Sequence, residues 1–381
     1  MRQHEKHMRV VICGGGVIGA CTALFLARRR VEVIIVERTG VANAASGRAG
    51  GFLAYDWCAG LPLDALARRS FTLHAQLPGE IKGDWGYRRM SAYAGFVFPE
   101  AKVRGRSLSK LGWLSDGVTI TTRLGTPETT AIVHPALFTT AVMQAAQEHG
   151  AQLRSGAVTG ILRRGEGSVV RGVEAGGEAI EADAVVIALG PWSGLAAQWV
   201  RLPAVMGQLS PSLVFNTGAD VPAESLFLDY QEATGAAFTV EIFPRADGST
   251  LVTAFSDEAP LPTDPADVKP DQDRIKRLEA ICERLSPAFA RSRIVTRQAC
   301  FRPVTQDGMP LIGTVPGNEG AYVATGHNVW GILNAPATGE ALAELIVDGF
   351  ATSTDLTPFN PTRLRPLDPA ISVRASPSAS T

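Results

Sequence analysis

The chain has 381 residues, which exceeds one ordinary hydrophobic core and predicts two domains or one domain with large insertions. Its 36 Lys and Arg residues nearly balance 37 Asp and Glu residues, so no overall field attracts nucleic acid or an anionic membrane. The sequence lacks an apolar run of membrane-spanning length, and the polar segment 1–7 leaves no room for a signal-peptide core. We therefore expect a cytoplasmic protein without a nucleic-acid partner or membrane insertion.

The five cysteines are odd in number and form no Cys-x-x-Cys pair. This pattern disfavours a disulfide framework or a zinc site, and we expect no metal ion. Cys13 and Cys21 fall in the first predicted strand and helix, where small buried apolar residues are the simplest interpretation.

The first elements along the chain are a strand, a glycine turn, a helix and a second strand. The apolar run 10–13 precedes a Gly-x-Gly-x-x-Gly turn at 14–19, and a helix is predicted over about 17–30. An apolar strand over 31–36 then ends on Glu37. This order is typical of a dinucleotide-binding unit, in which the start of the helix faces a pyrophosphate.

Each glycine of that turn has a steric role in such a unit. Gly14 makes the tight turn, Gly16 admits the pyrophosphate, and Gly19 brings the helix close to the strands. Glu37 can accept hydrogen bonds from ribose hydroxyls, and its charge would repel a ribose 2′-phosphate. The sequence therefore predicts a bound dinucleotide and disfavours NADP.

Further along the chain, irregular segments alternate with helices and strands. A small-residue loop at 42–51 is followed by an irregular region at 58–127. A helix over about 134–149 has apolar residues at helical spacing. The continuous apolar run 184–188, which ends in glycine at Gly190, is typical of a strand buried on both faces.

The second half of the chain is predicted to be rich in strands before the first pattern returns. Apolar runs at 236–244 and 250–255 flank turn residues and predict a hairpin. A helix is predicted over about 272–285, and strand, glycine-rich loop and helix return between 300 and 349. The Ser-, Thr- and Pro-rich end, from 351 onward, predicts a tail.

This interleaving predicts an α/β fold: a Rossmann-like nucleotide-binding domain of discontinuous segments with an interleaved, β-rich α+β substrate domain. A ligand that reaches from one domain to the other would lie in the cleft between them. The expected nucleotide-binding segments are 8–57, 128–201 and 296–350, the substrate-domain segments are 58–127 and 202–295, and the tails are 1–7 and 351–381.

Five segments in order resemble the FAD-dependent glycine/D-amino-acid oxidase (DAO) family, which includes sarcosine oxidases and related amine dehydrogenases. The segments are 14–37, 45–51, 189–193, 302–313 and 324–339. The resemblance implies that the dinucleotide is FAD, with its ADP half on the first unit and its isoalloxazine ring toward the domain cleft. Two regions, 58–127 and 202–297, match only loosely, and substrate specificity would lie there.

The resemblance also implies which residues contact the cofactor. Ser46 and Arg48 would meet the pyrophosphate and the flavin edge, or they belong to an ordinary polar loop. Trp192 either covers FAD or is simply packed in the core. The expected contacts are Gly14, Gly16, Val17, Ile18, Gly19, Glu37, Arg38, Ser46, Arg48, Ala49, Gly50, Gly51, Val158, Gly190, Trp192, Cys300, Gly326, Gly331 and Ile332.

The stretch 326–334 is expected beside the flavin ring. A helix over about 337–347 follows it and would aim its N–H groups at the pyrimidine side, where positive potential favours the anionic reduced flavin. His327 is either a neighbour of the ring or a structural histidine.

Arg302 is the expected recognition residue for a substrate carboxylate. A guanidinium grips a carboxylate with two parallel hydrogen bonds, and in the glycine-oxidase branch the arginine of the Arg-Pro motif has this role. A surface salt bridge is the alternative. Cys300 stands where monomeric sarcosine oxidases carry a covalent bond to the flavin, although those enzymes lack the Arg-Pro pair. A buried, unlinked thiol is the other interpretation of Cys300.

These residues suit a flavoprotein because flavin amine oxidation asks little acid–base chemistry of the protein. The expected function is FAD-dependent oxidation of the C–N bond of a small amino acid or N-alkyl amine, with dioxygen as acceptor. One alternative is a flavin dehydrogenase that uses another electron acceptor. A catalytically idle FAD-binding scaffold or regulatory protein is the alternative from a different class. The oligomeric state is left open.

Overall fold

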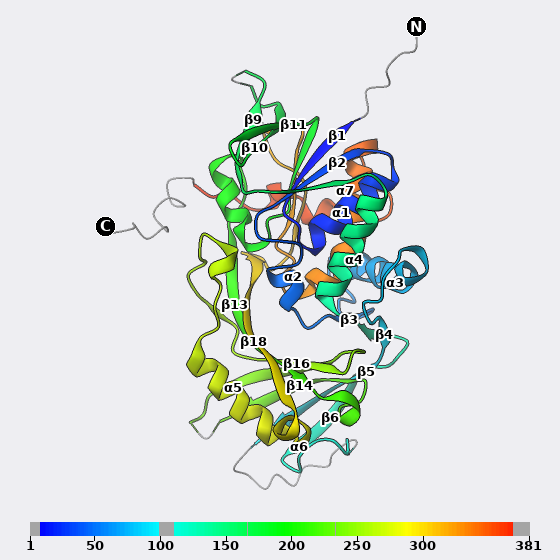
Figure 1. The fold of residues 1–381 in the computed structure, drawn as a ribbon, viewed down its shortest axis with the longest axis vertical. Coiled ribbons are helices and arrows are strands. Elements are labelled where there is room, and N and C mark those ends of the chain that lie inside the picture. Colours follow the sequence, from blue (N-terminus) through cyan, green and yellow to red (C-terminus); the bar gives the residue numbers. More distant parts are fainter. Residues whose placement is uncertain (1–7, 99–109, 166, 233, 369–381) are drawn as a thin grey trace, which may run out of the picture.

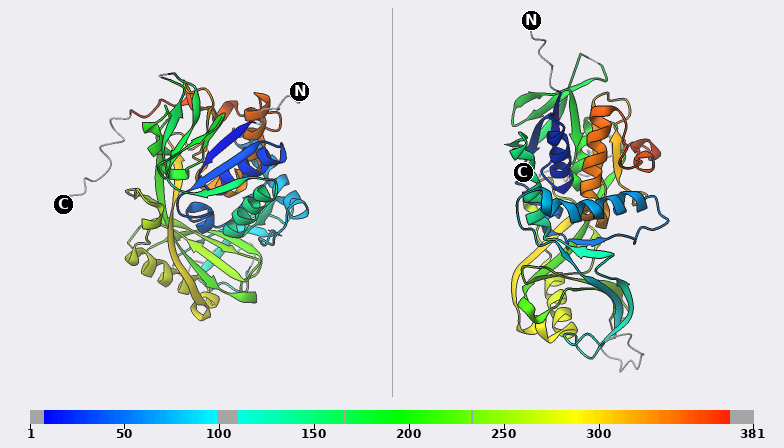
Figure 2. Two further views of the ribbon diagram at one scale, coloured as in Figure 1. Left: turned by 45° about the horizontal axis from the view of Figure 1, so that its top comes forward. Right: turned by 90° about the vertical axis from the view of Figure 1, so that its right-hand side faces the viewer.

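The computed structural model describes residues 8–98, 110–165, 167–232 and 234–368. It has two parts that lie one above the other along the long axis (Figure 1, Figure 2). None of the described helices is both long and apolar enough to cross a lipid bilayer.

The upper part in Figure 1 is built on a six-stranded sheet. Neighbouring strands run parallel, except that the edge strand β19 pairs antiparallel with β20. The order across the sheet is β19 (Leu311–Thr314), β20 (Ala321–Thr325), β12 (Ala184–Ile187), β1 (Arg9–Cys13), β2 (Glu32–Glu37) and β8 (Gln152–Ser155).

Both faces of this sheet are covered. One face carries α1 (Val17–Arg28), α4 (Pro135–Glu148) and α7 (Gly331–Asp348), and α3 (Asp64–Glu80) packs against α7. The other face carries an antiparallel sheet of β9 (Val158–Arg163), β10 (Val170–Ala175) and β11 (Glu178–Glu181).

Alternate residues of β1 therefore serve two different cores. Val10 and Ile12 pack in the core on the helical side, whereas Val11 and Cys13 pack in the core that contains Val173 of β10. This alternation explains the continuous apolar run in the sequence, because both faces of the strand need apolar side chains.

The lower part is a large sheet. Two helices, α5 (Gln272–Leu285) and α6 (Pro287–Arg291), cover one face of this sheet. The strand order is β17 (Asp257–Glu258), β13 (Val205–Asn216), β16 (Ser249–Thr253), β15 (Ala237–Pro244), β14 (Glu224–Gln231), β5 (Ser91–Val97) and β6 (Val118–Gly125), with β18 (Arg293–Thr305) on β13. A small sheet of β3 (Phe52–Ala54), β7 (Thr130–Ile132) and β4 (Arg88–Arg89) lies beside it.

Two long strands join the parts. β13 and β18 pair antiparallel from Val205↔Thr305 to Asn216↔Arg293, and they run from the lower sheet toward the upper part (Figure 1). Near the upper part, β18 contacts the single helical turn α2 (Ala45–Arg48) and the 3-10 helix Gly190–Gln198. The ladder thus brings residues of β18 to the junction of the two parts.

The predicted fold class is confirmed: a Rossmann-like α/β domain of discontinuous segments carries an interleaved β-rich part. The strand–turn–helix–strand unit appears as β1, α1 and β2. The predicted hairpin appears as the antiparallel pair β15 and β16.

The last long helix begins earlier than the sequence predicts, because α7 starts at Gly331 and contains Pro336. A proline inside a helix leaves the carbonyl four residues earlier without its N–H partner, here the carbonyl of Ile332. Nε2 of the buried His74 lies 2.9 Å from that oxygen. Burial lowers the pKa of His74 to about 4, so the neutral ring donates this hydrogen bond and stabilises the helix at Pro336.

The end of the chain also departs from the prediction, because residues 351–368 pack against the protein. Phe359 is buried, and Nε of Arg363 lies 2.7 Å from a carboxylate oxygen of Asp307. The N–H of Leu367 donates to the carbonyl of Leu202 at 2.8 Å. One aromatic side chain and these polar contacts hold a segment whose composition predicted a tail. Residues 1–7 and 369–381 lie outside the described part.

Candidate cofactor and substrate site

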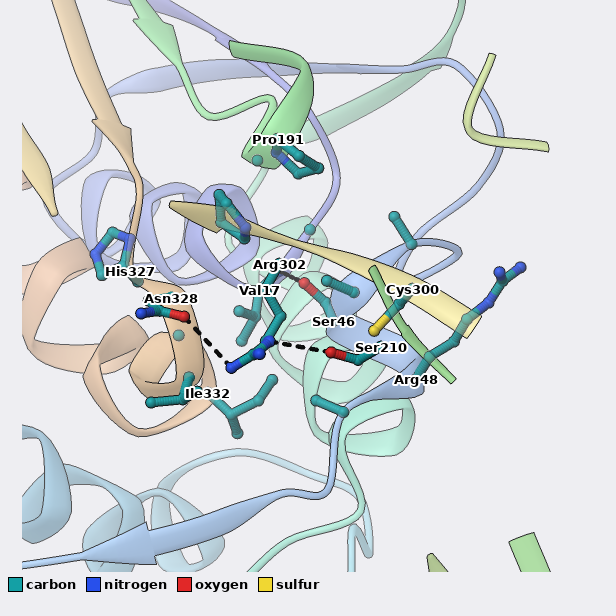
Figure 3. Close-up of a pocket in the computed structure, with 18 of the residues that line it drawn as sticks. Val17, Ser46, Arg48, Pro191, Ser210, Cys300, Arg302, His327, Asn328 and Ile332 are labelled. Atoms are coloured by element: carbon teal, nitrogen blue, oxygen red, sulfur yellow. Dashed lines mark hydrogen bonds between the residues drawn. The ribbon is translucent and has the colours of Figure 1, made fainter. Parts of the chain in front are cut away.

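A cavity of about 990 Å³ lies where the two parts meet. Residues of the glycine turn, α1 and β2 line one end of it, and residues of β13, β15 and β18 line the other. Figure 3 shows Val17 and Ser46 in this cavity together with Cys300 and Arg302 of β18 and with His327 near the start of α7.

Nearly all the residues predicted to form the site line this one cavity. They are Gly14, Gly16, Val17, Ile18, Glu37, Arg38, Ser46, Arg48, Ala49, Gly50, Gly51, Val158, Gly190, Trp192, Cys300, Arg302, His327, Gly331 and Ile332. Gly19 and Gly326 do not line it. A side chain at Gly326, which has a φ of +78°, would press on Thr305, so this glycine shapes the loop behind the cavity wall.

The glycine turn is fixed by close backbone contacts. Gly14 has a φ of +111°, and a Cβ atom there would lie 2.4 Å from the carbonyl oxygen of Ala188. At Gly19, a Cβ atom would lie 2.1 Å from the carbonyl oxygen of Gly14, so this glycine lets α1 approach the turn. Around Gly16, the nearest atom to an added Cβ is the Ser46 hydroxyl oxygen at 3.1 Å. The turn is therefore a backbone cradle that side chains would fill.

The carboxylate of Glu37 is held in place at the end of β2. One of its oxygens accepts the N–H of Gly15 at 2.7 Å, and the other accepts the N–H of Thr39 at 2.7 Å. These bonds fix an acidic group on the cavity wall at the point where the sequence predicts a ribose acceptor.

Ser46 and Arg48 lie on the short helix α2 beside the start of α1. The Ser46 hydroxyl oxygen accepts the N–H of Val17 at 2.9 Å, which leaves its hydrogen for a second partner (Figure 3). Arg48 donates to the carbonyl of Ala299 at 2.8 Å and so ties α2 to β18. Besides their predicted role as cofactor contacts, these two side chains fix α2 between α1 and β18.

The segment 259–271, which leads into α5, is hydrogen-bonded to both sides of the dinucleotide end of the cavity, which is the end lined by α1 and β2. The indole N–H of Trp192 donates to the carbonyl of Pro262 at 2.7 Å, while Arg38 pairs with Asp264 at 2.6 Å. Trp192 is 7% exposed yet lines the cavity, so it is packed and adjacent to the ligand space at once. Gly190, with a φ of +56°, begins the 3-10 helix that carries this tryptophan.

The start of α7 faces the cavity, since Gly331 and Ile332 line it. His327 is buried just before it, and its Nε2 lies 3.1 Å from the hydroxyl oxygen of Thr338. Burial lowers the pKa of His327 to about 3, so the ring is neutral at physiological pH. Its Nδ1 is buried and has no hydrogen-bond partner among the residues that the structure describes. The helix start therefore offers a positive dipole end beside a neutral imidazole.

Arg302 lies in the cavity wall and is held by three neutral side chains. Nε donates to Ser210 at 3.2 Å, one terminal nitrogen donates to Gln208 at 2.9 Å, and the other donates to Asn328 at 3.4 Å (Figure 3). Burial lowers its pKa. No ion pair within 4.0 Å joins it to a carboxylate of the described residues, which argues against the surface salt bridge that the sequence left open.

Cys300 lies two residues before Arg302 on the same face of β18. It is 7% exposed, and burial raises the pKa of its thiol to about 11 against the lowering effect of two nearby guanidinium groups. The thiol is therefore protonated and weakly nucleophilic at neutral pH.

Sequence analysis missed several residues of the substrate end. Glu241 of β15 and Ser210 of β13 line the cavity near Arg302, and neither belongs to a motif. Their only signal was an alternating pattern in a strand, which equally describes a surface position. Aromatic side chains also line this end: Phe52, Trp57, Phe227, Phe243 and Trp330.

The residues present fit a bound dinucleotide, since a glycine cradle, a fixed acid and a helix start line one continuous cavity. The fold and this cavity define the class of protein as an enzyme that binds a dinucleotide on a Rossmann-like domain. The family model of the FAD dependent oxidoreductases (DAO) matches residues 9–345. The chain belongs to this family, and its cofactor is FAD.

Relatives with assigned reactions match almost the whole chain. The glycine oxidase of Pseudomonas putida is 27% identical over 387 residues, which cover 93% of this chain and 98% of that protein. The crystal structure of glycine oxidase from Geobacillus kaustophilus has a TM-score of 0.77 at 26% identity, covering 93% and 99% of the two chains. The structure of L-amino acid deaminase from Proteus myxofaciens shares the fold, with a TM-score of 0.77 at 22% identity over 94% of each chain. This protein is thus an FAD-dependent oxidoreductase of the amino-acid oxidase type.

Proposed function

We propose that this protein oxidises the C–N bond of a small amino acid or N-alkylated amino acid, and that Arg302 binds the substrate carboxylate. The observation that carries the proposal is the hydrogen-bonding state of this guanidinium. A guanidinium has five N–H donors, and three of them are used by Ser210, Gln208 and Asn328. The two that remain are one on each terminal nitrogen, which is the pair that a carboxylate accepts in a bidentate contact.

The protein's own contribution is to orient the substrate. Three side chains, two on β13 and one in the turn before α7, hold the guanidinium plane, so a bound carboxylate has a fixed direction and its α-carbon a restricted position. FAD supplies the hydride acceptor when it is bound. The start of α7 places its positive dipole end at the cavity, where negative charge would develop.

Dioxygen is the electron acceptor that we propose. The names of relatives support it, since several are glycine oxidases, although a D-amino acid dehydrogenase is also among them. Turnover measured in oxygenated buffer and with an artificial acceptor under nitrogen separates the two. Turnover only with the artificial acceptor would assign a dehydrogenase.

The visible spectrum of the purified holoprotein under anaerobic conditions tests the reaction class. We expect pooled D-amino acids, glycine and N-methylated amino acids to bleach the flavin band, and splitting the pool then identifies the substrate. An oxidised flavin that no amine reduces would contradict the proposed reaction and favour an FAD-binding scaffold.

A further inference from the structure

A second ionisable group, opposite in charge to Arg302, lines the substrate end of the cavity. Glu241 lies on β15, lines the cavity and is partly buried. It forms no hydrogen bond or ion pair with the described residues, and Arg302 is near enough to affect its charge without touching it. Burial raises the pKa of Glu241, and the positive charge of Arg302 opposes that rise. Among the described residues, no cation is therefore paired directly with the Glu241 carboxylate.

The strand register places aromatic side chains around Glu241. Phe227 of β14 is its direct cross-strand partner, and Phe243 lies two residues along β15 on the same face. Trp57 packs against Phe227 with ring centroids 5.0 Å apart and also lines the cavity. An acid bordered by aromatic faces is favourable to an ammonium group, because both attract a cation.

Few other charges face this position. Arg302 and the protonated Cys300 come from β18, and β16 contributes the neutral Thr253 opposite Glu241. The acid nearest to it on β14 is the exposed Asp229, which accepts a hydrogen bond from Thr239 at 3.2 Å and does not line the cavity. Arg48, Asp257, Arg274 and Arg277 also line the cavity, but among the described residues Arg302 is the one charged group that affects the pKa of Glu241. Glu241 and Arg302 are thus the opposed charges near this position.

We propose that Glu241 binds the ammonium group of a zwitterionic substrate whose carboxylate is held by Arg302. This inference rests on the proposed function and narrows its substrate class to amino acids that arrive with a charged amine. The carboxylate of Glu241 then takes one ammonium proton and becomes the neutral acid, while the nitrogen keeps the electron pair of the broken N–H bond. An amine can form a C=N bond only with that pair free, so Glu241 prepares the substrate for oxidation.

The test uses two ligands of the same shape that cannot be oxidised as amines. Trimethylammonioacetate carries a permanent cation without a nitrogen lone pair, and 3,3-dimethylbutanoate replaces that nitrogen with carbon. Calorimetric titration of the FAD-loaded protein at pH 8 gives both affinities. We expect the wild-type protein to prefer the cationic ligand by about tenfold or more. The variant Glu241→Gln should lose most of this preference, and Glu241→Asp should keep part of it.

The matched control is Asp229→Asn, which removes an acid from the neighbouring strand outside the cavity and should leave the preference unchanged. The FAD content and the melting temperature of each variant show that it is folded. Equal affinities in the wild-type protein, no binding of either ligand, or a preference that survives Glu241→Gln would overturn the inference. Because neither ligand is turned over, a failure of amine oxidation itself would show only in the flavin reduction experiment.

Discussion

The two ends of the cavity differ in what forms their walls: backbone atoms at the dinucleotide end and side chains at the substrate end. At the dinucleotide end, backbone atoms approach so closely that an added Cβ at Gly14 or Gly19 would meet a carbonyl oxygen at 2.4 or 2.1 Å. At the substrate end, the wall consists of side chains from separate strands, such as Arg302 on β18 and Glu241 on β15. The first construction requires glycine at fixed spacing and so leaves a motif. The second leaves little more than the Arg-Pro pair at 302–303, because a sheet holds many side chains equally well.

The largest effect should come from a substitution in the glycine turn at the dinucleotide end. Gly14→Ala places a Cβ 2.4 Å from the carbonyl oxygen of Ala188 and strains a φ of +111°. We expect loss of FAD binding and destabilisation by about 3 kcal/mol or more. The control Gly60→Ala also has a positive φ, +77°, but open space around it, and should cost about 1 kcal/mol. FAD content and thermal unfolding measure both; equal effects would mean that the clash is unimportant.

Breaking the side-chain end should remove activity and spare the fold. Arg302→Met deletes the proposed carboxylate contact, and we expect kcat/KM to fall about a hundredfold or more while FAD stays bound. Arg297→Met removes an arginine from the same strand at an exposed ion pair with Glu279 and serves as the control. Steady-state kinetics on the substrate found by flavin reduction decide the matter. Comparable losses in the two variants would contradict a specific role for Arg302.

A smaller effect is expected for a substitution that weakens α7, the helix that starts at the cavity. His74→Phe removes the hydrogen bond to the Ile332 carbonyl, and we expect the free energy of unfolding to fall by about 1–3 kcal/mol at pH 7. His149→Phe, at the exposed C-terminal end of α4, should change it by less than about 0.5 kcal/mol.

The pH dependence of the same variant gives a second readout. Folding lowers the pKa of His74 from its ordinary 6.5 to about 4, so the unfolded state binds its proton first. Its neutral form thus contributes stability that is complete above pH 6.5 and is lost as the pH falls toward 4. Denaturant unfolding from pH 7 to 4 should show a shallower loss in His74→Phe than in the wild type. Parallel curves would mean that folding does not shift the pKa of His74.

The smallest effect is expected for a substitution of Cys300 on β18. Its thiol is held protonated by burial, so we expect FAD to bind without a covalent bond. Denaturation and filtration should release the flavin from the wild-type protein and from Cys300→Ser alike. Flavin that stays with the denatured wild-type chain but leaves the serine variant would show that the thiol is linked.

The comparison also explains how much the sequence could predict. The first unit followed from residues 14–37, where spacing, helix start and acid are all local. The FAD family followed from this unit together with four later segments. Glu241 could not be found, because its place in the same cavity as Arg302 depends on the pairing of β18, β13, β16 and β15 across the sheet. The start of the last helix was predicted at about 337, whereas α7 begins at Gly331 and includes Pro336. The distant His74, which bonds the carbonyl that Pro336 leaves without a partner, could not be read from the local sequence.

The long ladder of β13 and β18 also matters for how such an enzyme changes. It fixes Arg302, the proposed carboxylate anchor on β18, through backbone pairing with β13, and β18 in turn contacts α2 at the cofactor end, whatever side chains the neighbouring strands carry. Residues such as Phe227 and Glu241, on β14 and β15, can therefore be exchanged while the anchor keeps its place. New specificities in this scaffold should thus arise by single substitutions on two strands, without loop remodelling or insertions.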